Sequence, residues 1–295
     1  MNAAMDRVGV VGLGIMGMAY ARNLIAAGHS VIGYDVISDP MTALAELGGS
    51  PAGSSADVAR ASDVVLLALP NVAALRQAVA ASGGVVEGAG PGLVVVEMGT
   101  FPLEHKKWAQ TELESAGAVL VDAPVSGTGL QAGAGEVVVY ASGDPAAIER
   151  TRPVFDALGK ATYDVGEFGN GSKMKYVANL LVSVNNLATA EAFVLGAAAG
   201  LDPAKILEVI SAGVGSSRIF EIRGPMIVAD DYPPAARLSM FLKDIDVIGG
   251  FARDLGVPTP LLDAALPWYQ QGVEAGLGDL DAAALARLLA SRETS

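Results

Sequence analysis

The sequence predicts an α/β protein in two parts: a doubly wound parallel sheet, then an all-α domain joined to it by a long interdomain helix. Short apolar strands alternate with helical segments up to about residue 165, as in parallel sheets covered by helices on both faces. A glycine-rich turn follows the first strand. Beyond residue 166 only helical patterns remain, so the domains are predicted to be residues 1–166 and residues 167–295.

The composition is that of a chain with a large apolar core. Of the 295 residues, 52% are hydrophobic and 17% are charged, and the net charge is −13. So negative a chain is a poor partner for nucleic acid or an anionic membrane. The absence of cysteine excludes disulfides, thiolate catalysis and cysteine-ligated zinc. With only two histidines, a histidine-rich metal site or a Ser-His-Asp triad has few sources, and no metal is predicted.

The first segment carries a dinucleotide-binding pattern. A buried strand is predicted over residues 7–11, a helix over residues 18–27 and a second strand over residues 30–34, which leads to Asp35. Between the first strand and the helix lies a G-x-G-x-x-G turn made of Gly12, Leu13, Gly14, Ile15, Met16 and Gly17. This order of strand, turn, helix and strand is the setting in which the pattern binds a dinucleotide.

The residues of the turn suit a pyrophosphate. Gly12 permits the tight turn, Gly14 lets backbone N–H groups approach the phosphates, and Gly17 lets the helix pack closely on the sheet. Asp35 lies 18 residues after Gly17, where a carboxylate accepts hydrogen bonds from an adenosine ribose. No arginine follows Asp35 to hold a 2′-phosphate. We therefore predict a Rossmann domain that prefers NAD, with NADP as the alternative.

The alternation continues through the first domain. Strands are predicted over residues 63–69, 93–97, 118–121, 136–142 and 161–165, and helices over residues 41–47, 55–61, 72–81, 102–116 and 145–158. Parallel strands deliver their carboxyl ends to the cofactor crevice. Leu69 ends one strand and is followed by Pro70 and Asn71, and Thr100 follows the next strand, so all four are expected near the cofactor. The alternative for Thr100 is an N-cap of the following helix.

A long helix is predicted from Lys173 to about Gly200, and a polar stripe runs along it. At spacings of four, four and three, the stripe consists of Lys175, Asn179, Ser183 and Asn186. The ordinary interpretation is a lysine that reaches solvent and asparagines that pair within a helix bundle. An ammonium beside an amide is also suited to holding and protonating a carbonyl oxygen. Because cysteine is absent and histidine is scarce, Lys175 is the best candidate for the proton donor.

Other segments offer weaker candidates. Ser126, Gly127 and Thr128 form a turn after a predicted strand, where hydroxyl and N–H groups suit a carboxylate; a plain strand-end turn is the alternative. Lys243 is predicted either to fold over the cofactor or to form a surface salt bridge with Asp244. Structural or solvated roles are predicted for His29, His105 and Arg218. Further helices are predicted over residues 203–212, 217–226, 238–255, 261–275 and 281–291.

In order and separation, these motifs resemble the β-hydroxyacid dehydrogenase family. That family includes 3-hydroxyisobutyrate dehydrogenases, tartronate semialdehyde reductases and glyoxylate/succinic semialdehyde reductases. The resemblance covers essentially the whole chain and rests on the glycine turn, on residues 122–127, on residues 169–179 and on residues 243–244. It implies a Rossmann domain, an interdomain helix and an all-helical domain that serves the substrate and oligomerisation, in a homodimer or homotetramer.

The resemblance also implies roles for single residues. Lys175 is expected to be the catalytic acid/base and Asn179 to assist it. Ser126 and Gly127 are expected to bind the substrate carboxylate, whereas Thr100 and Lys243 are expected to contact the cofactor.

The chain departs from the family pattern at two places. The family usually has glycine at the position of Thr128, so the substrate turn is expected to be more crowded. A segment made of Glu97, Met98, Gly99 and Thr100 replaces a more usual Asp-x-Ser-Thr. Neither departure affects Lys175.

We therefore predict a cytoplasmic NAD(P)-dependent oxidoreductase that interconverts a small β-hydroxy acid and its semialdehyde or oxo acid by hydride transfer. The predicted partner is a small carboxylate-bearing hydroxy acid or semialdehyde, with neither nucleic acid nor membrane. The uncharged stretch over residues 176–190 is interpreted as a buried helix of a soluble protein, not as a membrane span. Two alternatives are an imine-reductase-like enzyme and a non-catalytic dinucleotide-binding sensor.

Overall fold

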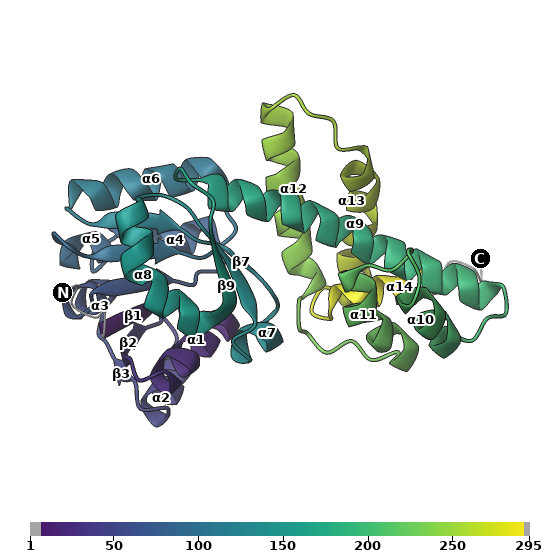
Figure 1. The fold of residues 1–295 in the computed structure, drawn as a ribbon, viewed down its shortest axis with the longest axis horizontal. Helices are drawn as coiled ribbons and strands as arrows, with labels where there is room; N and C mark the ends of the chain where they lie inside the picture. Colours follow the sequence, from purple (N-terminus) through teal and green to yellow (C-terminus); the bar gives the residue numbers. More distant parts are fainter. Residues whose placement is uncertain (1–6, 292–295) are drawn as a thin grey trace. The chain divides into compact units, whose positions relative to one another are not determined.

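The computed structural model of the protein describes residues 7–291, which divide into two compact units (Figure 1). The first unit ends at Lys175 and the second begins at Tyr176. Helix α9 (Asn170–Ala198) is continuous across this boundary. Its first turns, including Lys175, therefore belong with the first unit.

The first unit is built on a six-stranded sheet with the order β3-β2-β1-β4-β5-β6. All of its pairings are parallel. The strand order reverses between β1 and β4, and in such sheets ligands bind outside the carboxyl ends of the strands at this point. This topology confirms the predicted doubly wound sheet and adds the short edge strand β3. The strands are β1 (Arg7–Val11), β2 (Ser30–Tyr34), β3 (Ser50–Pro51), β4 (Val64–Leu67), β5 (Val94–Glu97) and β6 (Val119–Asp122).

Helices cover both faces of this sheet (Figure 1). The helices are α1 (Ile15–Ala26), α2 (Ser38–Glu46), α3 (Ser55–Ala61), α4 (Val72–Ala80), α5 (Val85–Gly88), α6 (Leu103–Ser115) and α8 (Pro145–Leu158). Successive strand residues point to opposite faces. Leu66 therefore joins a core with α1, α2 and α8, whereas Leu67 joins another with α3 to α6. Helix α1 begins three residues earlier than predicted, within the glycine turn.

The last strands of the unit form a separate sheet of three strands, in the order β7-β8-β9. They are β7 (Val125–Ser126), β8 (Val137–Ala141) and β9 (Gly159–Asp164), and the short helix α7 (Gly129–Gly133) lies between the first two. The sequence pattern predicted a single parallel sheet through residue 165. A parallel crossover needs about a dozen or more residues. The connection from β7 to β8 is shorter than that, and these two strands pair antiparallel.

Up to residue 291, where the described part of the chain ends, the named elements of the second unit are all helical, as predicted. Besides the rest of α9 they are α10 (Pro203–Ser211), α11 (Arg218–Ala229), α12 (Leu238–Asp254), α13 (Pro260–Gly272), α14 (Leu285–Ala290) and two short helical turns, η1 (Val273–Leu277) and η2 (Ala282–Ala284). Their core gathers Tyr176, Leu187, Phe241 and Tyr269. Within residues 7–291, α9 alone has the length and composition of a membrane span, but core helices of soluble proteins pass the same test. Leu187 and Phe193 of α9 are buried within this unit.

Candidate functional site

The residues predicted to bind a cofactor lie at one edge of the parallel sheet. Because β1, β2, β4 and β5 are parallel neighbours, the segments that follow them emerge at the same edge. The glycine turn follows β1, Asp35 follows β2, residues 69–71 follow β4 and Thr100 follows β5. The structure thus brings these four segments together within the first unit.

The backbone of the glycine turn leaves room for a phosphate group. Gly12 has a φ of +89°, and a Cβ atom there would lie 2.4 Å from the carbonyl oxygen of Ala68. A Cβ atom at Gly17 would lie 1.8 Å from the carbonyl oxygen of Gly12. At Gly14, by contrast, a Cβ atom would have no atom within 4 Å other than those of Gly14 and its two chain neighbours. The protein itself needs no glycine at that position, but an approaching pyrophosphate does. The N-terminus of α1 also has no side-chain cap, so its amides suit an anion.

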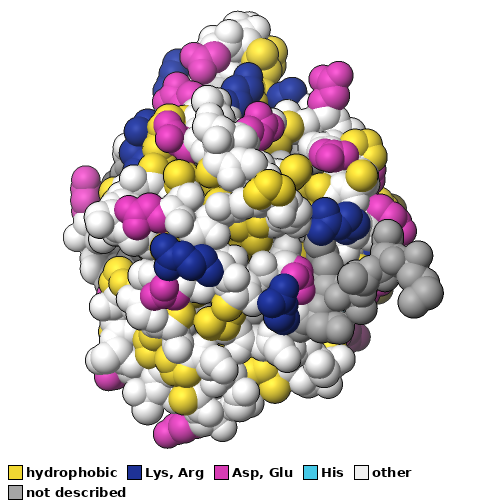
Figure 2. All heavy atoms as spheres, turned by 90° about the vertical axis from the view of Figure 1, so that its left-hand side faces the viewer, with side chains coloured by type: hydrophobic (Ala, Val, Ile, Leu, Met, Phe, Trp, Pro, Cys, Tyr) yellow, Lys and Arg dark blue, Asp and Glu magenta, His cyan; other side chains and the backbone are white. Residues whose placement is uncertain are grey.

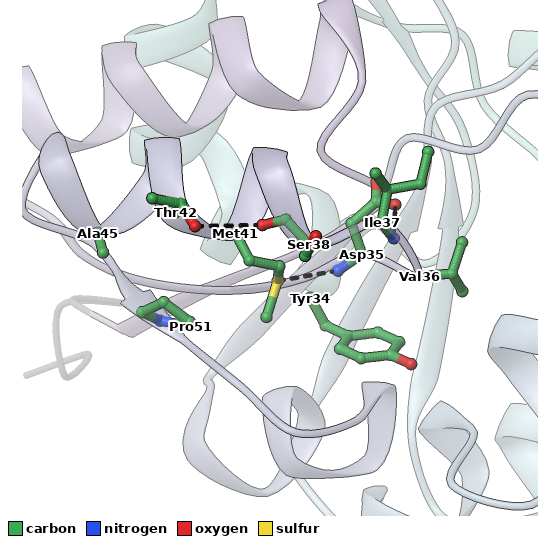
Figure 3. A pocket seen from close by; sticks show the side chains of 9 residues that line it. All are labelled: Tyr34, Asp35, Val36, Ile37, Ser38, Met41, Thr42, Ala45 and Pro51. Atoms are coloured by element: carbon green, nitrogen blue, oxygen red, sulfur yellow. Dashed lines mark hydrogen bonds between the residues drawn. The ribbon is translucent and has the colours of Figure 1, made fainter.

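Asp35 connects the second strand to the glycine turn. Its Oδ2 atom accepts a hydrogen bond of 2.7 Å from the backbone N–H of Leu13, and its Oδ1 atom accepts one of 2.9 Å from the N–H of Ile37. Beside it lies an open pocket (Figure 3), lined by Tyr34, Asp35, Val36, Ile37, Ser38, Met41, Thr42, Ala45 and Pro51. The nine lining residues include neither lysine nor arginine. The pocket therefore suits an uncharged adenosine group better than a phosphorylated one.

The segments after β4 and β5 have defined local roles. A Cβ atom at Gly12 would lie 3.1 Å from Cδ2 of Leu69, so this side chain lies against the glycine turn. Asn71 is the N-cap of α4, and its Oδ1 atom accepts a hydrogen bond of 2.8 Å from the N–H of Ala74. The N-cap position of α6 is Pro102, two residues after Thr100.

The turn after β7 lies beside the glycine turn. Gly127 has a φ of +149°, and a Cβ atom there would lie 2.8 Å from Cγ1 of Val137. Thr128 forms a capping box at the start of α7, with its N–H donating to Oε1 of Gln131 at 2.9 Å. This cap gives a structural reason for threonine where the family has glycine. A Cβ atom at Gly129 would lie 2.5 Å from Ile15, which places the turn near the cofactor edge.

Two predicted residues of the second unit lie around one carboxylate. Asn179 is buried and donates a 2.7 Å hydrogen bond from Nδ2 to Oδ2 of Asp244. The Nζ atom of Lys243 lies 3.1 Å from the other oxygen of Asp244. Only 15% of the Asp244 side chain is exposed, so the Lys243–Asp244 pair is not a plain surface salt bridge. The sequence assigned Asp244 no role at the site, although residues 243–244 are one of the motifs on which the family resemblance rests.

The residues of the polar stripe of α9 have different surroundings along the helix. Lys175 is half-buried near the start of the helix. Further along, Asn186 donates from Nδ2 to the hydroxyl of Tyr269 and to the carbonyl oxygen of Ala282, both at 3.0 Å. Tyr269 in turn donates to the carbonyl oxygen of Ser183 at 3.0 Å. The part of the stripe at Ser183 and Asn186 thus forms a packing contact within the helical unit.

Sequence reasoning also missed a buried ionic cluster at the ends of β5 and β6. The ammonium of Lys106, a residue for which no role was predicted, is fully buried between the carboxylates of Glu97 and Asp122. Two acidic residues at the ends of buried strands were the available signal, because buried charges are paired. Among residues 7–291, no group of three or more His, Asp or Glu side chains is placed to hold a metal ion.

The comparisons with known proteins agree with this geometry. Residues 7–166 match the family model described as the NAD binding domain of 6-phosphogluconate dehydrogenase. Residues 169–289 match the model described as NAD-binding of NADP-dependent 3-hydroxyisobutyrate dehydrogenase. L-Threonate dehydrogenase of Cupriavidus necator is 33% identical over 95% of this chain and 95% of its own. The chain belongs to the β-hydroxyacid dehydrogenase family. As a member of this family it is an NAD(P)-dependent oxidoreductase.

Two further family members cover nearly the whole chain. Glyoxylate/succinic semialdehyde reductase 1 of Arabidopsis thaliana is 31% identical over 94% of this chain and 96% of its own. The crystal structure of 3-hydroxyisobutyrate dehydrogenase from Salmonella typhimurium has a TM-score of 0.87 at 33% identity, covering 96% of this chain and 99% of that one. An imine reductase from Bacillus cereus has a TM-score of 0.62 at 22% identity, covering 96% and 98%. That likeness shows the shared fold alone.

Proposed function

We propose that this enzyme interconverts a small β-hydroxy acid and its semialdehyde or oxo acid, with Lys175 as the general acid/base. One observation carries the assignment of Lys175. Its helix begins with hydrogen bonds to the end of β6, at the same edge of the sheet as the glycine turn. Lys175 follows one turn later and is half-buried. An ammonium fixed in this way suits proton transfer beside a nicotinamide.

Each residue has a defined part in the proposed reaction. The bound nicotinamide cofactor exchanges the hydride with the substrate carbon. In reduction Lys175 donates a proton from Nζ to the carbonyl oxygen, and in oxidation it removes the proton from the hydroxyl. Ser126 and Gly127 hold the substrate carboxylate with a hydroxyl and a backbone N–H. Asn179, whose amide is held by Asp244, orients the substrate oxygen or Lys175. Thr100 and Lys243 contact the cofactor.

For the cofactor, we propose a preference for NAD. A carboxylate at Asp35 accepts hydrogen bonds from ribose hydroxyls and repels a 2′-phosphate. The pocket beside it has no cation among its lining residues to offset that repulsion.

For the substrate, the relatives define the panel to test. They are named for L-threonate, for glyoxylate and succinic semialdehyde, and for 3-hydroxyisobutyrate. Turnover should therefore be measured with threonate, 3-hydroxyisobutyrate, glycerate, 4-hydroxybutyrate and serine. Cyclic imines belong in the same panel, because turnover of imines alone would favour the imine-reductase alternative. Failure with every compound would favour a dinucleotide sensor.

The decisive test is Lys175→Ala, with Lys173→Ala as its control. General acid–base catalysis contributes about 10² to 10⁴ in rate, so kcat should fall by that factor while the Kd for NADH is unchanged. Lys173 lies two residues away on the same helix, is exposed, and donates to Oδ1 of Asn170 at 2.9 Å. Its replacement should leave kcat unchanged. Near-normal turnover by Lys175→Ala would refute the proposed role.

We also propose that the enzyme is a cytoplasmic homo-oligomer. Val177, Leu181 and Leu195 are more than half exposed on α9, at 59%, 55% and 73%. Apolar side chains in such a row suit a contact with a second copy. Neither nucleic acid nor a membrane is proposed as a partner. On the face drawn in Figure 2, basic side chains are interspersed with acidic ones instead of gathering in a patch.

A further inference from the structure

The buried ionic cluster consists of Glu97, Lys106 and Asp122, whose side chains have no exposed surface. Lys106 comes from α6, and the two carboxylates come from the last residues of β5 and β6. The Nζ atom of Lys106 lies 2.7 Å from Oδ1 of Asp122 and forms an ion pair with Glu97. Burying three ionised groups is costly, and replacing such groups by apolar residues is often neutral or stabilising. Stability alone is therefore a poor reason for this cluster.

One side of the cluster fixes the turn that leads to Thr100. Lys106 donates from Nζ to the carbonyl oxygen of Gly99 at 2.7 Å. Glu97 accepts the N–H of Gly99 on Oε1 at 2.8 Å. Both backbone groups of Gly99 are thus bound by the cluster. The backbone next to Thr100 consequently has little freedom to move.

The other side of the cluster holds the first turn of α9. Asp122 accepts the N–H of Ser172 on Oδ2 at 2.8 Å and the Ser172 hydroxyl on Oδ1 at 2.9 Å. Ser142 bridges the same carboxylate and the N–H of Gly171, with hydroxyl contacts of 3.3 Å and 2.9 Å. A carboxylate at a helix N-terminus is favoured, since the first amides have no partner within the helix.

Close packing reinforces these hydrogen bonds. A Cβ atom at Gly171 would lie 2.3 Å from the carbonyl oxygen of Tyr140 and 2.7 Å from that of Asp122. The helix backbone therefore sits directly on β6 and β8. Lys175 follows Ser172 by three residues, which is about 4.5 Å along a helix axis. A shift of the first turn consequently moves the Cα atom of Lys175 with it.

We propose that Glu97, Lys106 and Asp122 are positioning residues that fix the Gly99–Thr100 turn and the helical turn bearing Lys175 relative to each other. The proposal rests on Lys175 being the acid/base. Hydride and proton transfer require both groups at a set spacing, and a misplacement of about 1 Å can cost about 10²-fold in rate. The cluster joins the two segments through Lys106, which contacts both Gly99 and Asp122.

The first test is Ser172→Ala, which removes one hydroxyl and retains the backbone hydrogen bond to Asp122. We expect kcat to fall about tenfold, with KM for the substrate and Kd for NADH changed by less than about twofold. The matched control is Ser62→Ala. Ser62 is also buried, in the same unit, and donates to the carbonyl oxygen of Val58 at 2.7 Å. That variant should lose stability without losing kcat. Unchanged kcat in Ser172→Ala, or equal losses in both variants, would overturn the proposal.

The second test asks whether the effect passes through Lys175. Residues that act as a unit show non-additive effects. In a Lys175→Ala background, Ser172→Ala should therefore cause no further loss of the residual rate. An additive tenfold loss there would show that Ser172 acts by another route and would overturn the proposal. The Lys175→Ala single variant separately judges the proposed function, because near-normal turnover in it would refute the acid/base role.

The third test addresses the link to the Thr100 turn. Lys106→Met removes the ammonium that joins Gly99 to Asp122 and keeps an unbranched side chain that is shorter by that one atom. It should lower kcat and also weaken NADH binding, whereas Ser172→Ala lowers kcat alone. An unchanged Kd for NADH in a folded Lys106→Met protein would remove Glu97 and Lys106 from the proposal. Should this variant fail to fold, Glu97→Gln tests the same link by keeping an acceptor for the N–H of Gly99 while removing the charge.

Discussion

Asp35 uses one carboxylate for two purposes. In the structure it holds the glycine turn by accepting the N–H of Leu13, and in the proposed complex it also accepts ribose hydroxyls. Its negative charge matters to the second purpose far more than to the first, because an amide oxygen also accepts a hydrogen bond from Leu13. Cofactor preference is therefore separable from the folding of the turn by a substitution that removes charge alone.

We predict that Asp35→Asn lowers kcat/KM for NADH and raises it for NADPH, so that the ratio of the two falls at least about tenfold. Loss of the carboxylate removes both the ribose acceptor and the repulsion of a 2′-phosphate. Steady-state kinetics with both cofactors measure the ratio. The control is Asp39→Asn, which makes the same charge change at a neighbouring residue that does not line the pocket. A ratio unchanged from the wild-type enzyme would contradict the role of Asp35.

Single residues differ in how far the sequence determines their surroundings. The glycine turn was predictable, because its G-x-G-x-x-G spacing and the strand and helix beside it lie within one short segment. Within this segment, a Cβ atom at Gly17 would meet the carbonyl oxygen of Gly12. The burial of Lys106 was not, because its partners stand at the ends of two separate strands. Nothing in the polar sequence around Lys106 shows that Glu97 and Asp122 come from adjacent strands. Strand pairing, which decides this contact, is a property of the whole sheet.

At the scale of elements, α9 shows where a periodic pattern stops being informative. The spacing of the stripe correctly predicted that Lys175, Asn179 and Asn186 share one side of a helix. It did not predict that the partners change along the helix, since Asn179 meets Asp244 and Asn186 meets Tyr269. Those partners lie in α12 and α13, and helix packing is not encoded in the period of one helix.

The hydroxyl of Tyr269 gives a test of this packing and of its pH dependence. Burial raises the pKa of Tyr269 to about 12 from 10.0. The pKa of Tyr269 in the folded state exceeds that in the unfolded state. The contribution of this hydroxyl to the free energy of unfolding is therefore complete below about pH 10 and is lost as the pH rises toward 12. One such group lowers the free energy of unfolding by at most about 1.4 kcal/mol per pH unit in this range.

Tyr269→Phe should therefore be less stable than wild type by about 1 kcal/mol at pH 8, through loss of its hydrogen bonds. The difference in free energy of unfolding should shrink between about pH 10 and 12. Only the wild-type protein has the Tyr269 hydroxyl, so only the wild type loses stability as that hydroxyl titrates. Urea unfolding can be followed by Trp268 in a Trp108→Phe background, which reports on the second unit. Tyr163→Phe is the control, since Tyr163 is 58% exposed. A stability difference that is the same at pH 8 and pH 11 would contradict this account.

At the scale of the whole molecule, the apolar face of α9 matters most. Val177, Leu181 and Leu195 lie within about 40° of one another around the helix, given about 100° per residue. Leu181 and Leu195 are separated by two heptads, and a seven-residue repeat is the spacing at which a helix presents one seam to another helix. The exposed side chains of this seam are apolar, whereas the core of the second unit is filled by other residues of the same helix. A second copy of the chain is the occupant that we propose for this seam.

Leu181→Lys should therefore shift the protein from an oligomer to a monomer at micromolar concentration. Placing an ammonium in an apolar contact costs its desolvation without providing a partner, while on a monomer surface the same ammonium is fully hydrated. Light scattering coupled to size-exclusion chromatography measures the mass, and far-ultraviolet circular dichroism checks that the helices persist. Ala197→Lys is the matched control, because Ala197 is exposed on the opposite side of α9 and should leave the mass unchanged. If Leu181→Lys keeps the wild-type mass, or if the wild-type enzyme is already a monomer, this seam does not hold two copies together.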